Sequence, residues 1–319
     1  MAMADRIYAA SPTDIEPEEL FHLIGQPRSP LVLDVRIAAD LAADPQIIPT
    51  ARQIAHTDIT HSGIGSLMSY CDSRLVVVYC QKGGKLSQGA AALLRHHGIK
   101  ALSLAGGHFG WRDLQLPLTP IAALGSIAVH EASHWVSTNR LTTDSLLSAW
   151  LIRRFVDPEA ILLFVDTDQV AAVADKFGAT IFGTIGNGSD GSGSILNQSW
   201  DERVTRFTAL LDNYDLGYTA LKLMAVLLKG TELWGNTVEP HVEPHVEPHA
   251  ESRVQSQVEY KMFGIHRIID GMAQLHPDSL SLVHACLPVF DACYQSLRSQ
   301  QAQAQHTKTQ QTGFGRTGS

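Results

Sequence analysis

The stretch LVVVYCQKGGKLSQGAAALLRHHG, residues 75–98, decides the fold of the first part of the chain. Its opening run is apolar and β-branched, which predicts a buried strand ending near Cys80. The glycine-rich segment QKGGKL follows, and the residues from Ser87 to Gly98 predict a helix with a serine cap and a glycine stop. This order of elements predicts an α/β unit with the cysteine at the carboxyl end of its strand.

Further strands and a helix are expected beside this unit. PLVLDVR (30–36) and KALSLAGG (100–107) are short apolar runs that predict strands, and a helix is expected within residues 11–25. Strands alternating with helices predict an α/β domain with a parallel sheet over residues 11–120. The proline-containing segment LPLTPIAALGS (116–126) is expected to be a linker that ends this domain.

Cys80 is the candidate nucleophile of this domain. Loop N–H groups at the carboxyl ends of parallel strands, with a helix N-terminus behind them, favour an anion. A thiolate in that position has a lowered pKa and reacts near neutral pH. Lys82 and Lys85 add positive charge, and Gly83 and Gly84 let the backbone donors turn inward. From position alone, a small buried apolar cysteine is an equally good interpretation.

Four ordered motifs make this region similar to a rhodanese domain nearly end to end. They are LVLDVR (31–36), IIPTARQI (47–54), the stretch 75–98, and ALSLAGGHFGWRDLQLPL (101–118). The resemblance implies a rhodanese-like parallel sheet flanked by helices. It also implies that Cys80 takes up sulfane sulfur as a persulfide and passes it to an acceptor. The loop implied to bind the substrate consists of Gln81, Lys82, Gly83, Gly84, Lys85 and Leu86.

The chain departs from this family's pattern at several positions. Thr50 stands where the family usually has glycine, whereas Asp34 and Arg36 match and are expected to pair structurally near the domain's edge. Many single-domain members have C-x-x-G-x-R-S, but here Lys85 takes the arginine place and the serine follows one residue later. Related phosphatases need an arginine at the loop's end to clamp phosphoryl oxygens, so Leu86 there disfavours phosphatase activity.

The second half is similar to the C-terminal domain of chromate-resistance (ChrB-type) proteins. The resemblance rests on HWVSTNRLTTDSLLSAWLIRRFVDP (134–158), on AILLFVDTDQVAAVADKFG (160–178) and on the helical patterns at 200–230 and 258–297. It implies a mostly helical α+β domain over residues 130–300.

The polar residues of this second domain are only partly those of the family. Ser148 stands where the family has cysteine, and IGNGSDGSGSILNQSW (185–200) replaces a segment with histidine and cysteine. We therefore expect no metal site in this copy. Asp144, Arg153 and Arg154 are candidates for an anion pocket, although surface or ion-paired arginines are the favoured interpretation.

Several segments are not expected to form regular or functional structure. The VEPH repeats mark a disordered insert over 236–256, and residues 301–319 are expected to be a disordered tail. Pro288 predicts a kink or break in the helix around it. GNGSDG (186–191) matches a dinucleotide-binding pattern, but no helical pattern opens after it, so that function is not expected.

Composition limits the remaining possibilities. The net charge of −8 argues against a nucleic-acid partner, and a hydrophobic content of 45% suits a globular protein. The sequence shows no signal peptide and no apolar run long enough to span a membrane, so we expect a cytoplasmic protein without a membrane partner. Its four cysteines do not predict a disulfide framework.

The expected function is a sulfurtransferase linked to chromate or other oxyanion resistance. It moves sulfane sulfur from a thiosulfate-like donor to a thiol or cyanide acceptor through the Cys80 persulfide. The expected partners are the small-molecule donor and the thiol acceptor, with no cofactor; the sequence does not specify an oligomeric state. The alternative is a non-catalytic oxyanion-sensing or regulatory protein of chromate resistance, whose loop binds an anion without turnover.

Overall fold

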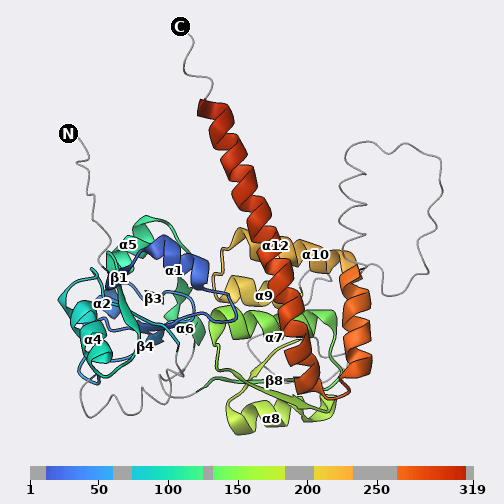
Figure 1. The fold of residues 1–319 in the computed structure, drawn as a ribbon. Coiled ribbons are helices and arrows are strands. Elements are labelled where there is room, and N and C mark those ends of the chain that lie inside the picture. The colour runs from blue at the N-terminus through green and yellow to red at the C-terminus, as the bar shows by residue number, and fades with distance from the viewer. Residues whose placement is uncertain (1–11, 60–73, 125–131, 184–204, 233–263, 314–319) are drawn as a thin grey trace. The chain divides into compact units, whose positions relative to one another are not determined.

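The computed structural model describes residues 12–59, 74–124, 132–183, 205–232 and 264–313 of the 319-residue chain (Figure 1). Its contacts divide the chain into two compact units. The first consists of residues 1–133, 152–161 and 213–216, and the second of the remaining residues. Each unit is described by itself.

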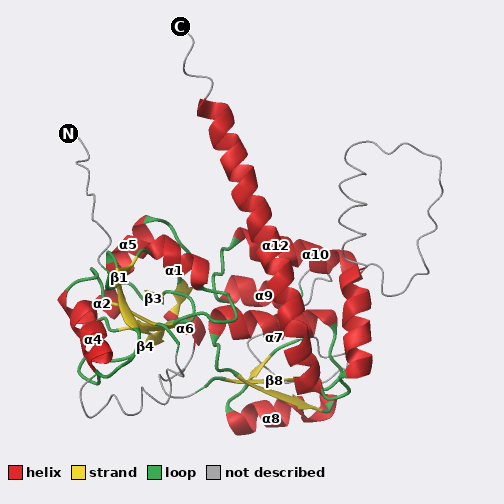
Figure 2. Ribbon diagram, in the orientation of Figure 1, coloured by secondary structure: helices red, strands yellow, loops and turns green. Residues whose placement is uncertain are grey.

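The first unit is built on a five-stranded sheet whose paired strands are all parallel (Figure 2). This confirms the predicted parallel sheet flanked by helices. Strand β5 lies in the middle of the sheet and all of its residues are buried, as its continuous valine run predicts. The strand order is β1 (Asp14–Ile15), β6 (Ala101–Leu104), β5 (Val76–Tyr79), β2 (Leu31–Asp34) and β4 (Arg52–Gln53).

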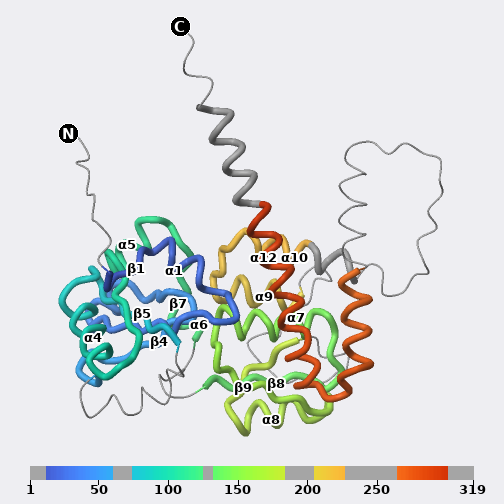
Figure 3. The backbone as a smooth tube through the Cα atoms, in the orientation of Figure 1, coloured from blue at the N-terminus to red at the C-terminus, as the bar shows by residue number. Residues whose placement is uncertain are grey.

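Helices follow the strands along this unit, as the tube in Figure 3 traces. Helix α4 buries Ser87, Ala90, Ala91 and Leu94, a three-to-four spacing that gives it one apolar face toward the sheet core. The helices of the unit are α1 (Pro17–Leu23), α2 (Ala38–Ala43), α4 (Lys85–His96), α5 (Gly107–Asp113) and α6 (Ile121–Leu124).

Two stretches of this unit contain strands that the sequence did not predict. The helix expected within 11–25 begins only at Pro17, because residues 14–15 pair with β6 as strand β1 and the Glu19 carboxylate accepts the N–H of Glu16 at the helix start. The linker expected at 116–126 also carries structure. Strand β7 (Thr119–Pro120) pairs antiparallel with β3 (Gln46–Ile47), and this long-range pairing is invisible to local sequence patterns.

A strained turn precedes strand β4. The N–H of Ala51 donates to the Ile48 carbonyl at 2.9 Å, with Pro49 and Thr50 between them. Thr50 has a φ of 67°, so this is a type II turn with a β-branched residue where glycine is favoured. Its hydroxyl is buried and has no hydrogen-bond partner among the described residues.

We expect Thr50→Gly to stabilise the protein by about 1 kcal/mol. The substitution relieves the left-handed strain and removes the buried unpaired hydroxyl, and glycine's greater freedom in the unfolded chain offsets part of this gain. Urea unfolding of the full chain measures the change. Thr50→Ala is the control, since it removes the hydroxyl but keeps the strain; a gain as large as that of glycine would contradict the turn argument.

The second unit is a helix-rich α/β domain around a small sheet in the order β10, β8, β9. Helix α7 is buried from Asp144 to Leu151, and the Trp150 indole donates to the Asp291 carboxylate at 2.8 Å. Gly178 ends α8 in a left-handed conformation. The strands are β8 (His134–Thr138), β9 (Ile161–Val165) and β10 (Thr180–Ile181). The helices are α7 (Thr143–Leu151), η2 (Thr167–Gln169), α8 (Val170–Phe177), α9 (Arg206–Asn213), α10 (Thr219–Glu232), a helix over 264–275 and α12 (Ser279–Gly313). The π-helical turn η1 (Ile152–Val156), which follows α7 in the chain, belongs to the first unit.

Helix α12 extends further than predicted. It runs without a break through Pro288, and it continues to Gly313, although a disordered tail was expected from residue 301. Alanine and glutamine are good helix formers, so the polar tail continues a helix that the packed part has already nucleated. The predicted insert 236–256 and the glycine-rich segment 186–191 lie outside the described residues.

Within the described ranges, no helix combines the length and the apolar character needed to cross a membrane. The long helix α12 carries a polar C-terminal half instead.

Candidate functional site

Cys80 directly follows β5, at the carboxyl end of a central strand, where the sequence analysis expected it. The residue is 6% exposed, so it is buried but not fully closed off from solvent. Cys286 and Cys293 are also free thiols, whereas Cys71 lies outside the described residues. Burial raises the pKa of Cys286 to about 11, which makes that thiol unreactive near neutral pH.

The surroundings of Cys80 favour its thiolate. Burial raises the pKa of the thiol, but hydrogen bonds from the Ser87 side chain and from the backbone N–H groups of Ser87, Lys82 and Gly84 lower it more. The net pKa therefore lies below that of an ordinary cysteine. The Cys80 Sγ lies 3.3 Å from the Ser87 Oγ. This group of donors forms a cradle for a negatively charged sulfur.

The contact between Ser87 and Cys80 was not predicted from the sequence. We expected it to cap the helix, but α4 begins at Lys85 and its cap position is Gly84, so Ser87 lies in the first turn. There its buried hydroxyl contacts both the Gly84 carbonyl, at 3.2 Å, and the cysteine sulfur. The only sign of this contact in the sequence was the position of Ser87, shortly after Cys80 at the end of the loop.

Removing the Ser87 hydroxyl should make Cys80 less reactive near neutral pH. Without this donor the thiolate loses a hydrogen bond, so the pKa of Cys80 rises and a smaller fraction is ionised at pH 7. We expect Ser87→Ala to slow alkylation of Cys80 at pH 7 by about tenfold, corresponding to one hydrogen bond of roughly 1.4 kcal/mol. The measurement is iodoacetamide labelling across pH, with the Cys80 peptide followed by mass spectrometry.

The comparison variant is Ser87→Thr, which keeps a hydroxyl at this position. It should hold the inflection of the pH profile near that of the unmodified protein. An alanine variant whose inflection does not move to higher pH would exclude Ser87 as a donor to the thiolate.

The backbone of the loop packs closely on the segment that follows β6. The N–H of His108 donates to the Cys80 carbonyl at 2.9 Å, and that of Phe109 to the Gln81 carbonyl at 3.0 Å. Gly83 has a φ of 63°, and a Cβ there would lie 2.6 Å from the Leu104 carbonyl oxygen. Gly107 is similarly confined. These contacts turn the loop carbonyls away from the sulfur, which leaves its N–H groups facing it.

The side chains of the predicted substrate-binding loop fall into three groups. Lys82 and Lys85 are exposed. Leu86 packs against the apolar core beside β5, so its side chain supports the loop. The Gln81 Oε1 is buried without a hydrogen-bond partner in the described part of the chain. The two lysines are therefore the loop side chains able to meet an anionic substrate.

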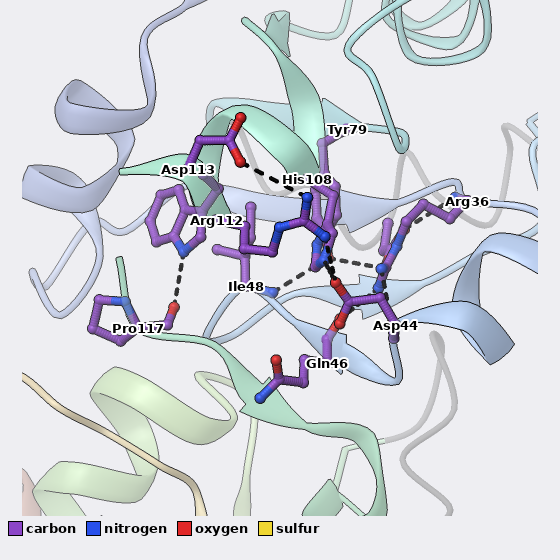
Figure 4. Close-up of polar contacts among 11 residues, drawn as sticks. Arg36, Asp44, Gln46, Ile48, Tyr79, His108, Arg112, Asp113 and Pro117 are labelled. Carbon is purple, nitrogen blue, oxygen red and sulfur yellow. Dashed lines mark hydrogen bonds and ion pairs between the residues drawn. The ribbon is translucent and has the colours of Figure 1, made fainter. Parts of the chain in front are cut away.

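A buried polar network includes Tyr79, the residue before Cys80 (Figure 4). Arg36 Nη2 lies 2.7 Å from Asp34 Oδ2, and both side chains are fully buried, so they form the expected structural pair. The Tyr79 hydroxyl donates to the same Asp34 oxygen at 2.9 Å. The pair lies within the sheet region and not at the domain's edge, because strand β2 has neighbours on both sides. Its burial indicates a structural role.

Of the candidate anion-binding residues of the second half, Asp144 holds the start of a helix. Asp144 accepts the backbone N–H groups of Arg206 and Phe207, at 3.2 and 3.1 Å, and so caps helix α9. Arg153 is partly buried, and burial lowers the pKa of its guanidinium. The Ser148 hydroxyl is buried and has no partner among the described side chains and backbone. Across the described ranges, no three His, Cys, Asp or Glu side chains gather to hold a metal ion.

Comparison with protein families finds two matches. Residues 16–114 match the rhodanese-like domain, and residues 135–297 match the C-terminal domain of ChrB. A comparison with curated proteins finds no match.

Solved structures are similar over about a third of the chain. A rhodanese homolog from Thermus thermophilus is 32% identical over 30% of this chain and 98% of its own, with a TM-score of 0.24. A protein from Lactobacillus plantarum is 26% identical over 33% of this chain and 87% of its own, with a TM-score of 0.28. A rhodanese-related protein from Thermoplasma volcanium is 20% identical over 33% and 95%, with a TM-score of 0.27.

Proposed function

Because this chain belongs to the family of the ChrB C-terminal domain and carries a rhodanese-like domain ahead of it, we propose that it is a sulfurtransferase. It moves sulfane sulfur from a thiosulfate-like donor to a thiol or cyanide acceptor through a persulfide on Cys80. The ChrB-type second domain supports a further proposal, that this activity serves resistance to chromate or a related oxyanion.

The observation that carries the proposal is the cradle around the Cys80 sulfur. Donors from Ser87, Lys82 and Gly84 face a single thiol whose pKa lies below its ordinary value. The same donors suit a persulfide, because its terminal sulfur is also an anion. A cysteine whose thiol has a lowered pKa is typical of nucleophiles. A cysteine that served only as packing would need none of them.

The reaction proceeds in two displacements on sulfur. The Cys80 thiolate attacks the sulfane sulfur of thiosulfate, a bond forms between the two sulfur atoms, and sulfite leaves with the electron pair of the broken bond. In the second step cyanide attacks the terminal persulfide sulfur, thiocyanate leaves, and the electron pair returns to Cys80 as thiolate. Each step transfers one sulfur atom without an external oxidant or reductant.

The loop favours an anionic sulfur donor over a phosphate ester. Lys82 and Lys85 are exposed beside a recessed sulfur, so they attract an anion without clamping it. A phosphatase needs a planar arginine fork on the phosphoryl oxygens. Leu86 occupies that end of the loop and packs against the core.

A persulfide assay tests the proposal. The full chain is treated with thiosulfate, and the Cys80 peptide is examined by mass spectrometry for the mass of one added sulfur atom, with thiocyanate formation from cyanide measured in parallel. Cys80→Ser is the control for both. A Cys80 peptide that gains no sulfur, together with no thiocyanate above the serine variant, would refute the proposal. Sulfate or chromate binding that survives Cys80→Ser without turnover would favour an anion sensor.

A further inference from the structure

His108 lies next to the Cys80 loop without being part of it. It is the second residue of α5, and its side chain is fully buried. The proposed reaction assigns it no role. His108 nevertheless contacts two residues at the cysteine: its backbone N–H bonds to Cys80, and its ring packs on Tyr79.

The backbone of His108 holds the cysteine's own carbonyl. Its N–H donates to the Cys80 oxygen at 2.9 Å, and the next N–H in the same helical turn, that of Phe109, donates to the Gln81 oxygen. Two successive peptide units of the loop are thereby fixed with their carbonyls toward α5. Because a peptide unit is planar, fixing the Gln81 carbonyl also orients the Lys82 N–H, which is one of the cradle donors.

The ring of His108 contacts Tyr79 and Asp44. It stacks on the ring of Tyr79, the residue before the cysteine, with centroids 6.4 Å apart and planes inclined by 18°. Its Nε2 lies 2.9 Å from the Asp44 Oδ2, which also receives Arg112 at 3.3 Å (Figure 4). Asp44 in turn is tied to Arg36, which donates to the Asp44 carbonyl at 3.2 Å.

The surroundings of the His108 ring favour its neutral form. Burial lowers the pKa of His108, and nearby Arg36 lowers it further, while Asp44 and Asp34 raise it less. A neutral ring whose Nε2 carries the proton donates it to Asp44, and its Nδ1 then has no hydrogen-bond partner among the described residues. One tautomer therefore fits this site, and it fixes the ring's orientation.

We propose that His108 is a positioning residue that holds the Cys80 loop in its sulfur-binding form, by tying the first turn of α5 to Asp44 and Tyr79. This inference rests on the proposed sulfur transfer for its effect on turnover. If the first turn of α5 shifts, the carbonyls of residues 80 and 81 lose their donors and the loop N–H groups no longer converge on the sulfur. His108 itself touches no reacting atom.

Three variants separate the two contacts of the ring. His108→Ala removes both, His108→Phe keeps an aromatic ring against Tyr79, and His108→Gln keeps a donor for Asp44. We expect alanine to move the inflection of Cys80 alkylation to higher pH and to lower kcat for thiocyanate formation by about tenfold, the scale of a small misplacement of a reacting group. The phenylalanine and glutamine variants should each keep the alkylation inflection and kcat closer to those of the unmodified protein than the alanine variant does.

The control for a merely structural effect is Trp111→Phe, on the same helix. The Trp111 indole is buried and donates to the Pro117 carbonyl at 2.8 Å, so its loss destabilises the domain without touching the loop. We expect a lowered midpoint of urea unfolding with an unchanged alkylation profile. The full chain is used throughout.

The outcomes separate this inference from the proposed function. A shifted alkylation profile in His108→Ala, absent in Trp111→Phe and partly restored by glutamine or phenylalanine, supports it. An unchanged profile in all three His108 variants overturns it, as does a shift that Trp111→Phe reproduces. Alkylation needs no sulfur donor, so it decides the role of His108 even if the unmodified protein forms no thiocyanate. If alanine prevents folding, the glutamine variant carries the same comparison.

Discussion

Replacing Gly107 with alanine is expected to lower kcat/KM for thiocyanate formation by about a hundredfold. Gly107 has a φ of 57°, and an added methyl group would overlap the Cys80 carbonyl oxygen and the Gly83 amide nitrogen. Both are backbone atoms of the loop, so relief requires the loop itself to move. Displacing a nucleophile and its donors by about an ångström is enough for a loss of this size. Steady-state assays and the persulfide yield on Cys80 measure it.

Gly98 provides a matched control for this substitution. It also has a left-handed conformation, with a φ of 81°, but an added Cβ would meet no atom within 4 Å. Gly98→Ala should therefore cost about 1 kcal/mol in unfolding free energy, from backbone strain alone, and leave sulfur transfer intact. Equal losses of activity in the two variants would show that strain, and not overlap with the loop, explains the effect.

The sequence predicted the centre of the first domain because its signals are local. A run of three valines before Cys80, two glycines after it and an apolar helical face define strand, loop and helix within 25 or so residues, and hydrophobic periodicity reports such elements well. The pair Gly106 and Gly107 was recognised as a motif. The structure shows why Gly107 has no side chain: a Cβ there would overlap the backbone of residues 80–83.

What the sequence did not predict depends on contacts between distant segments. Ser87 contacts Cys80 because the loop folds back on itself, and His108 reaches Asp44 across 64 positions. The pairing of β7 with β3 likewise joins residues some 70 positions apart. No local pattern encodes these partners, since burial and pairing are set by the packed domain. The helix beyond residue 301 was not predicted for a different reason: it continues a helix that has already formed, so it needs no apolar pattern of its own.

Replacing Arg36 with methionine is expected to cost about 3–5 kcal/mol of unfolding free energy, the usual effect of removing one member of a buried ion pair. The Asp34 carboxylate would remain fully buried without its cationic partner. The carbonyls of Asp44 and Gln46, which accept from Arg36 at 3.2 and 2.6 Å, would also lose a donor. Urea unfolding of the full chain measures the loss.

Two further variants identify the cause of that loss. Asp34→Asn combined with Arg36→Met leaves no buried charge and keeps an acceptor for the Tyr79 hydroxyl, so it should recover part of the stability that Arg36→Met alone removes. Asp113→Asn tests an exposed pair, since Arg112 and Asp113 are 48% and 72% exposed and 3.8 Å apart; it should change stability by less than about 0.5 kcal/mol. A double variant less stable than Arg36→Met would mean that lost packing and lost carbonyl donors dominate over the uncompensated charge. The Asp34–Arg36 pair would then stabilise the loop between α2 and β3 chiefly through the arginine's hydrogen bonds.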